Sequence, residues 1–319
     1  MLNFEKEKDG SVYLNIFNKK KFLYTSSCKY TKIFSKRFDF LTREELRYLL
    51  EVQFEMELKY KINLDNPKTL DEKIQWIKFN YHDPLMTKCA DKVKARDYIK
   101  EKIGEQYLVP SLGIYNSADE INFDKLPNRF ALKVNWGCKE NVICEDKSQL
   151  NIKEAKKQLT NWLKKENNHY YKYFEWQYKD IEPKILCEEY VDCGLKFKEY
   201  KLFCFNGKMK FISTVENIGK DCWINFFDTS LKKLPFKRTR YPDDSSLFPD
   251  TNNYHKMVEL AEELARPFPL VRVDFYEDIN KKIRFGELTF TPSNGHMNLR
   301  PQEWNYKLGE YLVLPKIKI

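Results

Sequence analysis

The sequence predicts an α+β fold with at least two lobes, and three features of its pattern support this. Segments with helical periodicity occupy residues 42–103, short β-rich segments follow them, and two hairpin signals lie in the second half of the chain. Aromatic residues make up 15% of the 319 residues. This share of large rings excludes a disordered chain, because their burial offsets the entropy that is lost on ordering.

Five segments carry the periodicity and the end signals of helices. The first begins at Thr42, which matches a capping box with Glu45 and precedes leucines at helical spacing. Residues 1–40 have no clear period and are interpreted as peripheral elements. The remaining helices are expected over 69–79, over 87–103 with a stop at Gly104, over 148–165 with Ser148 as a cap, and over 253–266.

Two hairpins are expected among the strands. Asn206-Gly207 separates two alternating runs, which is a strong signal for a tight turn between antiparallel strands. The segments VRVDFYED and KKIRFGELTF form the second hairpin, with a turn near Asp278 to Lys281. Strands and helices alternate irregularly along the chain, which favours the α+β class.

Composition excludes several classes of protein. The most apolar windows, such as FALKV and WINFF, are about five residues long, whereas a membrane-spanning helix needs about 20. The start, MLNFEKEKDG, lacks the features of a signal peptide. The eight cysteines contain no C-x-x-C pair, and four histidines offer no zinc spacing. We therefore expect reduced thiols and a cytoplasmic location. The protein would be either dissolved in the cytoplasm or bound peripherally at the inner face of the membrane.

The formal net charge of +9 attracts polyanions, which include nucleic acid, anionic lipid and nucleotide phosphates. The basic residues are mostly lysines that are interspersed with acids along the whole chain. A nucleic-acid-binding surface would favour arginines interleaved with aromatic platforms. We therefore expect no nucleic-acid partner.

The last hairpin carries the most informative charged residues. Strand alternation places Arg272 and Asp274 on one face, and pairing of the strands brings Asp274 close to Glu287. Two facing carboxylates repel each other unless a cation lies between them, and Mg²⁺ favours one or two carboxylates together with phosphate oxygens. Arg272 is suited to hold phosphate oxygens bidentately. The alternative is an exposed strand face with an Arg–Glu pair.

Three further segments carry charged residues whose function the pattern alone leaves open. Lys133 lies in an apolar strand, where it either meets an anion or extends to solvent from an edge strand. The loop after it contains Gly137 and Lys139 and is able to arch over phosphates. Arg96 belongs to a helix whose charged face, taken alone, favours solvent exposure over a binding role. Glu188 and Glu189 lie at the end of an apolar strand. Such a pair is typical either of a hinge that binds a nucleotide or of an exposed strand end.

The order of these segments resembles the ATP-grasp superfamily. The likeness is closest to its TupA-like branch, which is found among genes for cell-surface polysaccharides and teichuronopeptide. It covers about residues 69–312 and rests on YLVP, LPNRFALK, CEEY, EYKLFCFNGK, VRVDFY and GELTFTP, in that order. The resemblance implies two α+β lobes that clamp ATP, preceded by a mainly helical N-terminal region. The implied boundaries are 1–105 for the N-terminal region, 106–190 for the small lid lobe and 191–319 for the large lobe.

The resemblance also implies roles for individual residues. ATP and Mg²⁺ are the implied cofactors. The catalytic residues would be Arg272, which steadies the transferred phosphoryl group, and Lys201, which faces the phosphates. The metal ligands would be Asp274 and Glu287, with Thr289 at the position where many relatives carry asparagine, and Asn294 as a recruited ligand. The nucleotide would be bound by Arg96, Lys133, Gly137, Lys139, the hinge residues Glu188, Glu189, Tyr190 and Val191, and Glu199 at the ribose.

The implied activity is the ATP-dependent joining of a carboxylate to an amine through an acylphosphate. The genes among which this branch is found suggest a uronic-acid acceptor in surface polysaccharide synthesis. They also suggest other pathway enzymes or the membrane surface as partners. Such chemistry needs no nucleophilic serine or cysteine, and His82, His169, His255 and His296 fit no catalytic triad.

Two alternatives of other classes are kept. A glycosyltransferase of the same pathway would carry a D-x-D-like motif at a strand end, and the sequence contains none there. A basic protein that binds nucleotides or nucleic acid without catalysis agrees with the net charge alone.

Overall fold

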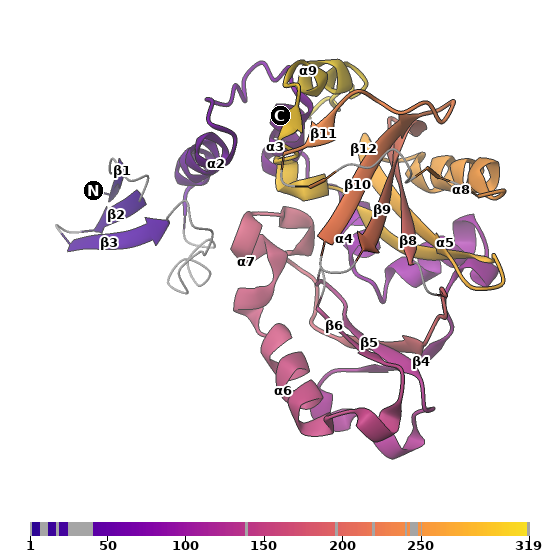
Figure 1. Ribbon diagram of the computed structural model, residues 1–319. Helices are drawn as coiled ribbons and strands as arrows, with labels where there is room; N and C mark the ends of the chain where they lie inside the picture. Colours follow the sequence, from indigo (N-terminus) through magenta and orange to yellow (C-terminus); the bar gives the residue numbers. More distant parts are fainter. Residues whose placement is uncertain are drawn as a thin grey trace.

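Two antiparallel sheets form the framework of the protein in a computed structural model (Figure 1). The structure describes residues 2–6, 12–16, 19–24, 41–137, 140–194, 197–218, 221–239, 241–242, 248–249 and 251–317. The four-stranded sheet has the order β4-β7-β5-β6, and the five-stranded sheet has the order β10-β9-β8-β12-β13. The strands are β4 (Ser111–Tyr115), β5 (Phe130–Val134), β6 (Asn141–Cys144), β7 (Ile185–Glu189), β8 (Lys198–Phe205), β9 (Lys208–Ile218), β10 (Asp221–Asp228), β12 (Leu270–Glu277) and β13 (Ile283–Thr289).

Both predicted hairpins are confirmed. β8 and β9 are joined through Asn206 and Gly207, whose φ angles of 47° and 80° are the left-handed pair that a tight hairpin turn requires. β12 and β13 pair so that Asp274 lies opposite Glu287, and the next pair joins Phe275 to Phe285. Gly286 is thus the extra residue of a β-bulge. The bulge returns Glu287 to the face of Asp274.

Helices pack on the five-stranded sheet. α8 (Tyr254–Ala265) packs on β8, β9 and β12, and its Ala261 is fully buried, as are Leu202 and Val273 of the sheet. α5 (Ala95–Lys102) is tied to α8 because the Tyr98 hydroxyl donates to the carbonyl of Leu264 at 2.9 Å. The remaining helices are α2 (Arg43–Leu58), α3 (Leu70–Asn80), α4 (Pro84–Ala90), α6 (Ile152–Trp162), α7 (His169–Tyr173) and α9 (Glu303–Glu310).

Local end signals predicted some helices correctly and others incorrectly. A capping box is present at Thr42, as expected, and a second one is present at Thr69, where the sequence predicted only the start of a helix. The helix expected over 87–103 is wrong, because it is two helices, α4 and α5, separated by a turn at the buried Asp91. The Asp91 carboxylate accepts from the amides of Val93 and Lys94, which replaces helical hydrogen bonds there.

The cap expected at Ser148 is also wrong. Ser148 lies in a 3₁₀ turn, and α6 begins after Asn151, whose side chain accepts from the amide of Glu154. Residues 1–40, expected only as peripheral elements, contain the three-stranded sheet β1 (Leu2–Lys6), β2 (Val12–Ile16) and β3 (Lys19–Tyr24). A short pair, β11 (Lys237–Arg238) and β14 (Leu299–Arg300), completes the strands of the described ranges. In those ranges, no helix is both long enough and apolar enough to cross a membrane.

Candidate functional site

A row of charged side chains crosses three neighbouring strands of the five-stranded sheet. Lys201 on β8 lies opposite Asp274 on β12, which lies opposite Glu287 on β13. The Lys201 ammonium is 2.7 Å from an Asp274 carboxylate oxygen and 3.0 Å from Glu199, two residues earlier on the same strand. Because side chains two residues apart share a face of a strand, this face carries several charges close together.

Arg272 joins the two carboxylates of this row. Its guanidinium donates to both oxygens of Asp274, at 2.7 and 2.6 Å, and to Glu287 at 3.0 Å. Thr289, two residues after Glu287, donates its hydroxyl to the same Glu287 oxygen at 3.0 Å. The hairpin therefore brings together Arg272, Asp274, Glu287 and Thr289. The strand pattern predicted the proximity of the first three, and the resemblance implied Thr289 beside them.

The charges of this cluster hold one another ionised. Burial lowers the pKa of Arg272, but the nearby Asp274 and Glu287 more than offset this and hold it above its usual value. Burial raises the pKa of Glu287, but Lys92, Arg272 and Lys201 outweigh it and bring that pKa down to about 2. Glu287 is thus a carboxylate at neutral pH, as a metal ligand must be.

The four-stranded sheet contributes a second cluster around Glu188. This buried carboxylate lies 2.7 Å from the Lys133 ammonium and 2.7 Å from the Arg96 guanidinium. Burial lowers the pKa of Lys133, but Glu188 reverses the direction and raises it, with smaller contributions from Tyr276 and Glu287 on the other sheet. Lys133 of one lobe therefore lies within electrostatic reach of the charged face of the other.

The other residues of the predicted nucleotide site that the structure describes do not join the ion pairs around Glu188. Glu189 is exposed at the end of β7, and its amide donates to the carbonyl of Pro110 at 3.0 Å. Tyr190 donates its hydroxyl to Glu145 and lies under the Arg129 guanidinium, and Val191 is half-buried. The carbonyl of Gly137 accepts from the Lys92 ammonium. Lys139 lies outside the described residues.

Two of the four predicted metal ligands are carboxylates, Asp274 and Glu287. The side-chain oxygen of Asn294 accepts a hydrogen bond from the Lys78 ammonium. This oxygen is therefore engaged by a lysine and not by the carboxylate pair. In the part of the chain that the structure describes, no group of three or more His, Cys, Asp or Glu side chains is arranged to hold a metal. Two carboxylates still suit Mg²⁺, which completes its coordination with water and phosphate oxygens.

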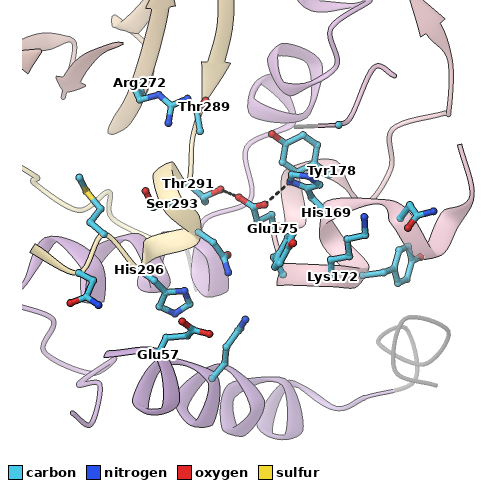
Figure 2. Close-up of a pocket in the computed structure, with 18 of the residues that line it drawn as sticks. Glu57, His169, Lys172, Glu175, Tyr178, Arg272, Thr289, Thr291, Ser293 and His296 are labelled. Carbon is cyan, nitrogen blue, oxygen red and sulfur yellow. Dashed lines mark hydrogen bonds and ion pairs between the residues drawn. The ribbon is translucent and has the colours of Figure 1, made fainter. Parts of the chain in front are cut away.

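A cavity of about 730 Å³ opens beside the charged face. Arg272, Glu287 and Thr289 line one part of it, and Figure 2 shows Arg272 and Thr289 at the end away from Glu57 and His296. A second space of about 40 Å³ lies between the sheets and is lined by residues of both clusters, including Arg96, Lys133, Glu188 and Glu287. Glu287 lines both spaces, so the two adjoin at this carboxylate.

Comparison with known families identifies the fold that carries this site. The model of the TupA-like ATP-grasp family matches residues 72–313 of the chain. The chain belongs to the TupA-like ATP-grasp family. The predicted α+β ATP-grasp fold is therefore confirmed, and both charged clusters and the 40 Å³ space lie inside the matched range. No curated protein matches the chain.

Solved ATP-grasp structures are distant from this TupA-like protein. D-cycloserine synthetase DcsG is 12% identical, with 72% of this chain and 71% of that chain covered and a TM-score of 0.40. Biotin carboxylase from Campylobacter jejuni, in a β-γ-ATP complex, is 14% identical over 77% of this chain and 49% of that chain (TM-score 0.39). D-alanine–D-alanine ligase from Bacillus anthracis, complexed with ATP, is 15% identical over 63% and 55% (TM-score 0.38). The TupA-like chain spans about half the length of most of these structures.

Sequence reasoning missed one cluster of this TupA-like protein. His169, which the sequence placed in no catalytic triad, lies 2.9 Å from the Glu175 carboxylate on the wall of the large cavity (Figure 2). The only signal for it in the sequence is the run NHYYKYFEWQY, in which a histidine and a glutamate stand among aromatic residues. The Lys92 ammonium, 4.0 Å from Glu287, was likewise not among the predicted site residues.

Proposed function

We propose that this protein is an ATP- and Mg²⁺-dependent ligase that joins a carboxylate to an amine through an acylphosphate. The observation that carries the proposal is the face shared by Lys201, Arg272, Asp274 and Glu287, which adjoins a cavity large enough for a second substrate. Membership of the TupA-like ATP-grasp family supports ATP as the phosphoryl donor. The two sheets support the lobe boundaries 106–190 and 191–319, after an N-terminal region of residues 1–105.

The donor set fits a magnesium ion. Asp274 and Glu287 face each other across neighbouring strands, and Thr289 adds a hydroxyl beside Glu287. When bound there, Mg²⁺ would neutralise negative charge on the phosphate oxygens. Arg272 and Lys201 already contact these carboxylates, so they lie where they would bind oxygens of the same phosphates.

The chain's own residues supply positioning and charge rather than a covalent intermediate. Lys133 on the four-stranded sheet and Arg96 on α5 would bind the nucleotide, with Glu188 holding both cations in place. A substrate carboxylate in the large cavity would attack the γ-phosphorus of ATP, and ADP would leave with the bonding electrons. Arg272 would stabilise the charge on the transferring oxygens. An amine would then displace phosphate from the acylphosphate.

The acceptor and the cellular setting belong to the proposal as well. We place the protein in cell-surface polysaccharide synthesis, with a uronic acid as the carboxylate and an amino acid or amino alcohol as the amine. The cavity wall mixes cations, acids and amides, among them Lys172, Glu57 and Asn167, which suits a polar, hydroxyl-rich substrate. We expect the protein to act in the cytoplasm or at the inner face of the membrane.

Phosphate release from ATP tests this proposal. D-glucuronate and D-galacturonate are each combined with glycine, L-alanine or ethanolamine, with and without Mg²⁺. The account predicts release that requires the carboxylate, the amine and Mg²⁺ together. Release of UDP from UDP-sugars, with no response to ATP, would instead support the glycosyltransferase.

Asp274→Asn is the matched test of the metal site. Loss of one carboxylate removes several kcal/mol of charge stabilisation, so phosphate release should fall at least about 100-fold. The control is Asp119→Asn, whose side chain is 90% exposed. Melting temperatures of both variants are compared, because Asp274→Asn also leaves Arg272 and Lys201 with fewer negative partners. A folded Asp274→Asn protein with unchanged turnover would contradict the assignment.

A further inference from the structure

A chain of four hydrogen-bonded side chains lies beside the large cavity. The Gln177 amide donates to the Thr291 hydroxyl at 2.8 Å, and this hydroxyl donates to the first oxygen of the buried Glu175 carboxylate. The second oxygen of Glu175 lies 2.9 Å from Nδ1 of His169. Figure 2 shows the last two of these contacts, which join the segment after β13 to α7 and the turn that follows it.

This chain fixes the protonation of the His169 ring. A carboxylate only accepts hydrogen bonds, so the proton of a neutral imidazole must lie on Nδ1, where it faces Glu175. Nε2 then carries a lone pair. Among the described residues, no hydrogen-bond partner engages Nε2, although His169 lines the cavity. The structure thus presents a proton acceptor on the cavity wall.

The ring is also held in place by packing. His169 lies edge-on to Tyr173, with ring centroids 5.4 Å apart, and 5.1 Å from the ring of Tyr178. Asn168 caps α7, because its side-chain oxygen accepts from the Tyr170 amide and its amide donates to the Tyr178 carbonyl. The helix ends at Phe174 with a φ of 58°, a turn that brings Glu175 back to His169. A rigid, oriented imidazole is suited to proton transfer.

Other charged groups surround this pair. The buried Lys78 ammonium lies near Glu175 and donates to the Tyr173 carbonyl and to Asn294. Lys172 on α7 pairs with Glu140 at 3.2 Å. Lys164 and Glu166 line the same cavity from the segment before α7. The pH at which His169 gains a proton therefore depends on all of the titratable groups around it. These are Glu175, Lys78, Lys172, Tyr173, Tyr178, Lys164 and Glu166.

We propose that His169 is the general base that removes a proton from the acceptor amine, and that Glu175 is the positioning residue that orients it. The inference rests on the proposed ligase function. An amine enters the cavity as an ammonium, and Nε2 of His169 accepts one of its protons. The amine nitrogen then attacks the acyl carbon and forms the C–N bond, and the C–O bond to phosphate breaks with its electrons on the phosphate. The second nitrogen proton leaves with the phosphate, and His169 returns its proton to water.

Two nucleophiles separate this role from a structural one. Hydroxylamine is mostly uncharged at pH 7 and traps an acylphosphate as a hydroxamate without a base. Ethanolamine is mostly charged and needs one. With D-glucuronate, ATP and Mg²⁺, His169→Asn should lower the rate of amide formation from ethanolamine by about 10²–10⁴-fold, with recovery at higher pH. Hydroxamate formation should fall far less.

Controls and a second variant complete the test. His255→Asn, on the exposed surface of α8, should change neither rate. Glu175→Gln removes the negative charge that stabilises the imidazolium formed on proton transfer. This variant should slow amide formation and shift the acidic limb of its pH–rate profile to lower pH, while hydroxamate formation falls far less. Nitrogen-15 NMR of the wild-type protein should show His169 protonated at Nδ1 and not at Nε2.

Each result supports or overturns the inference. His169→Asn protein that retains the wild-type amide rate, or that loses both products equally, overturns the role of His169 and leaves the ligase proposal standing. A ring protonated at Nε2 in the neutral form also overturns it. Wild-type protein that forms neither hydroxamate nor amide from any uronic acid contradicts the proposed function itself, and the role of His169 falls with it.

Discussion

At the scale of single residues, Lys133 connects the four-stranded sheet with the charged face of the five-stranded sheet. Its ammonium forms an ion pair with Glu188, and the negative charge of Glu287 on the opposite sheet also stabilises it. A lysine in this position costs free energy unless an anion lies nearby. The surroundings of Lys133 therefore favour the nucleotide-binding interpretation over that of a lysine extending to solvent.

Removal of this ammonium should weaken ATP binding without unfolding the protein. Lys133→Ala leaves Glu188 paired with Arg96, so the buried carboxylate keeps one cation. A hydrogen-bonded charge pair contributes about 1.5–3 kcal/mol, so the ATP dissociation constant measured by calorimetry should rise roughly 10- to 100-fold. Lys157→Ala, 79% exposed on α6, serves as the control. Equal ATP affinity of the two variants would remove Lys133 from the site.

At the scale of elements, α9 packs directly on the start of α3. A Cβ atom at Gly309 would lie 2.2 Å from the carbonyl oxygen of Lys68 and 3.0 Å from the amide nitrogen of Leu70, both backbone atoms. The Lys73 ammonium closes the same contact by donating to the carbonyls of Gly309 and Leu312. The close approach of the two helices thus depends on glycine.

Gly309→Ala should therefore destabilise the protein. Alanine favours a helix by about 1 kcal/mol over glycine, but overpacking against backbone costs about 1–3 kcal/mol. The clash should outweigh the helical preference, because neither backbone atom is able to swing away. Urea denaturation should show a lower midpoint than that of the neighbouring exposed Glu310→Ala. A urea midpoint of Gly309→Ala above that of the wild type would contradict this, because it would mean that α9 moves away from α3 without loss of stability.

A buried carboxyl group on α3 makes stability depend on pH. Asp71 is fully buried, and this burial raises its pKa to about 6, although the Met297 amide and the Asn305 side chain donate to it. The ordinary pKa is 3.8, so between about pH 4 and pH 6 the folded state binds more protons than the unfolded one. The contribution of Asp71 to stability is therefore lost as pH rises through this window, by about 2–3 kcal/mol.

Asp71→Asn should abolish this part of the pH dependence. The free energy of unfolding of the wild type relative to the variant should fall from pH 4 to pH 6 and then stay level. Denaturant titrations at a series of pH values measure this difference. The exposed Asp97→Asn should follow the wild type throughout. A difference between wild type and Asp71→Asn that is constant with pH would show that Asp71 is ionised alike in both states.

Prediction from the sequence succeeded where signals are local. The capping box at Thr42 lies within four residues, and the Asp274–Glu287 pairing follows from a hairpin. It failed at Asp91, because the carboxylate that ends α4 is held by Asn135, more than 40 residues away. Helical periodicity alone continues through such a position.

At the scale of the whole molecule, the large cavity is assembled from segments that are distant in the chain. Its lining includes Gln53 and Glu57 of α2, several residues between Asn161 and Tyr178, and several between Thr291 and Asn298. No periodicity or spacing in the sequence relates these segments, since only tertiary packing brings them together. The sequence therefore predicted the proximity of Arg272, Asp274 and Glu287 through one hairpin, but not the His169–Glu175 pair or the cavity.

The binding of a nucleotide between the two sheets is the central claim, and a thermal-shift titration with ATP tests it most directly. Millimolar ATP at a site with a dissociation constant of about 10 µM should stabilise the folded protein by close to 3 kcal/mol. The account predicts a clear rise in melting temperature with ATP, larger when Mg²⁺ is present. An unchanged melting temperature with ATP, with or without Mg²⁺, would contradict it.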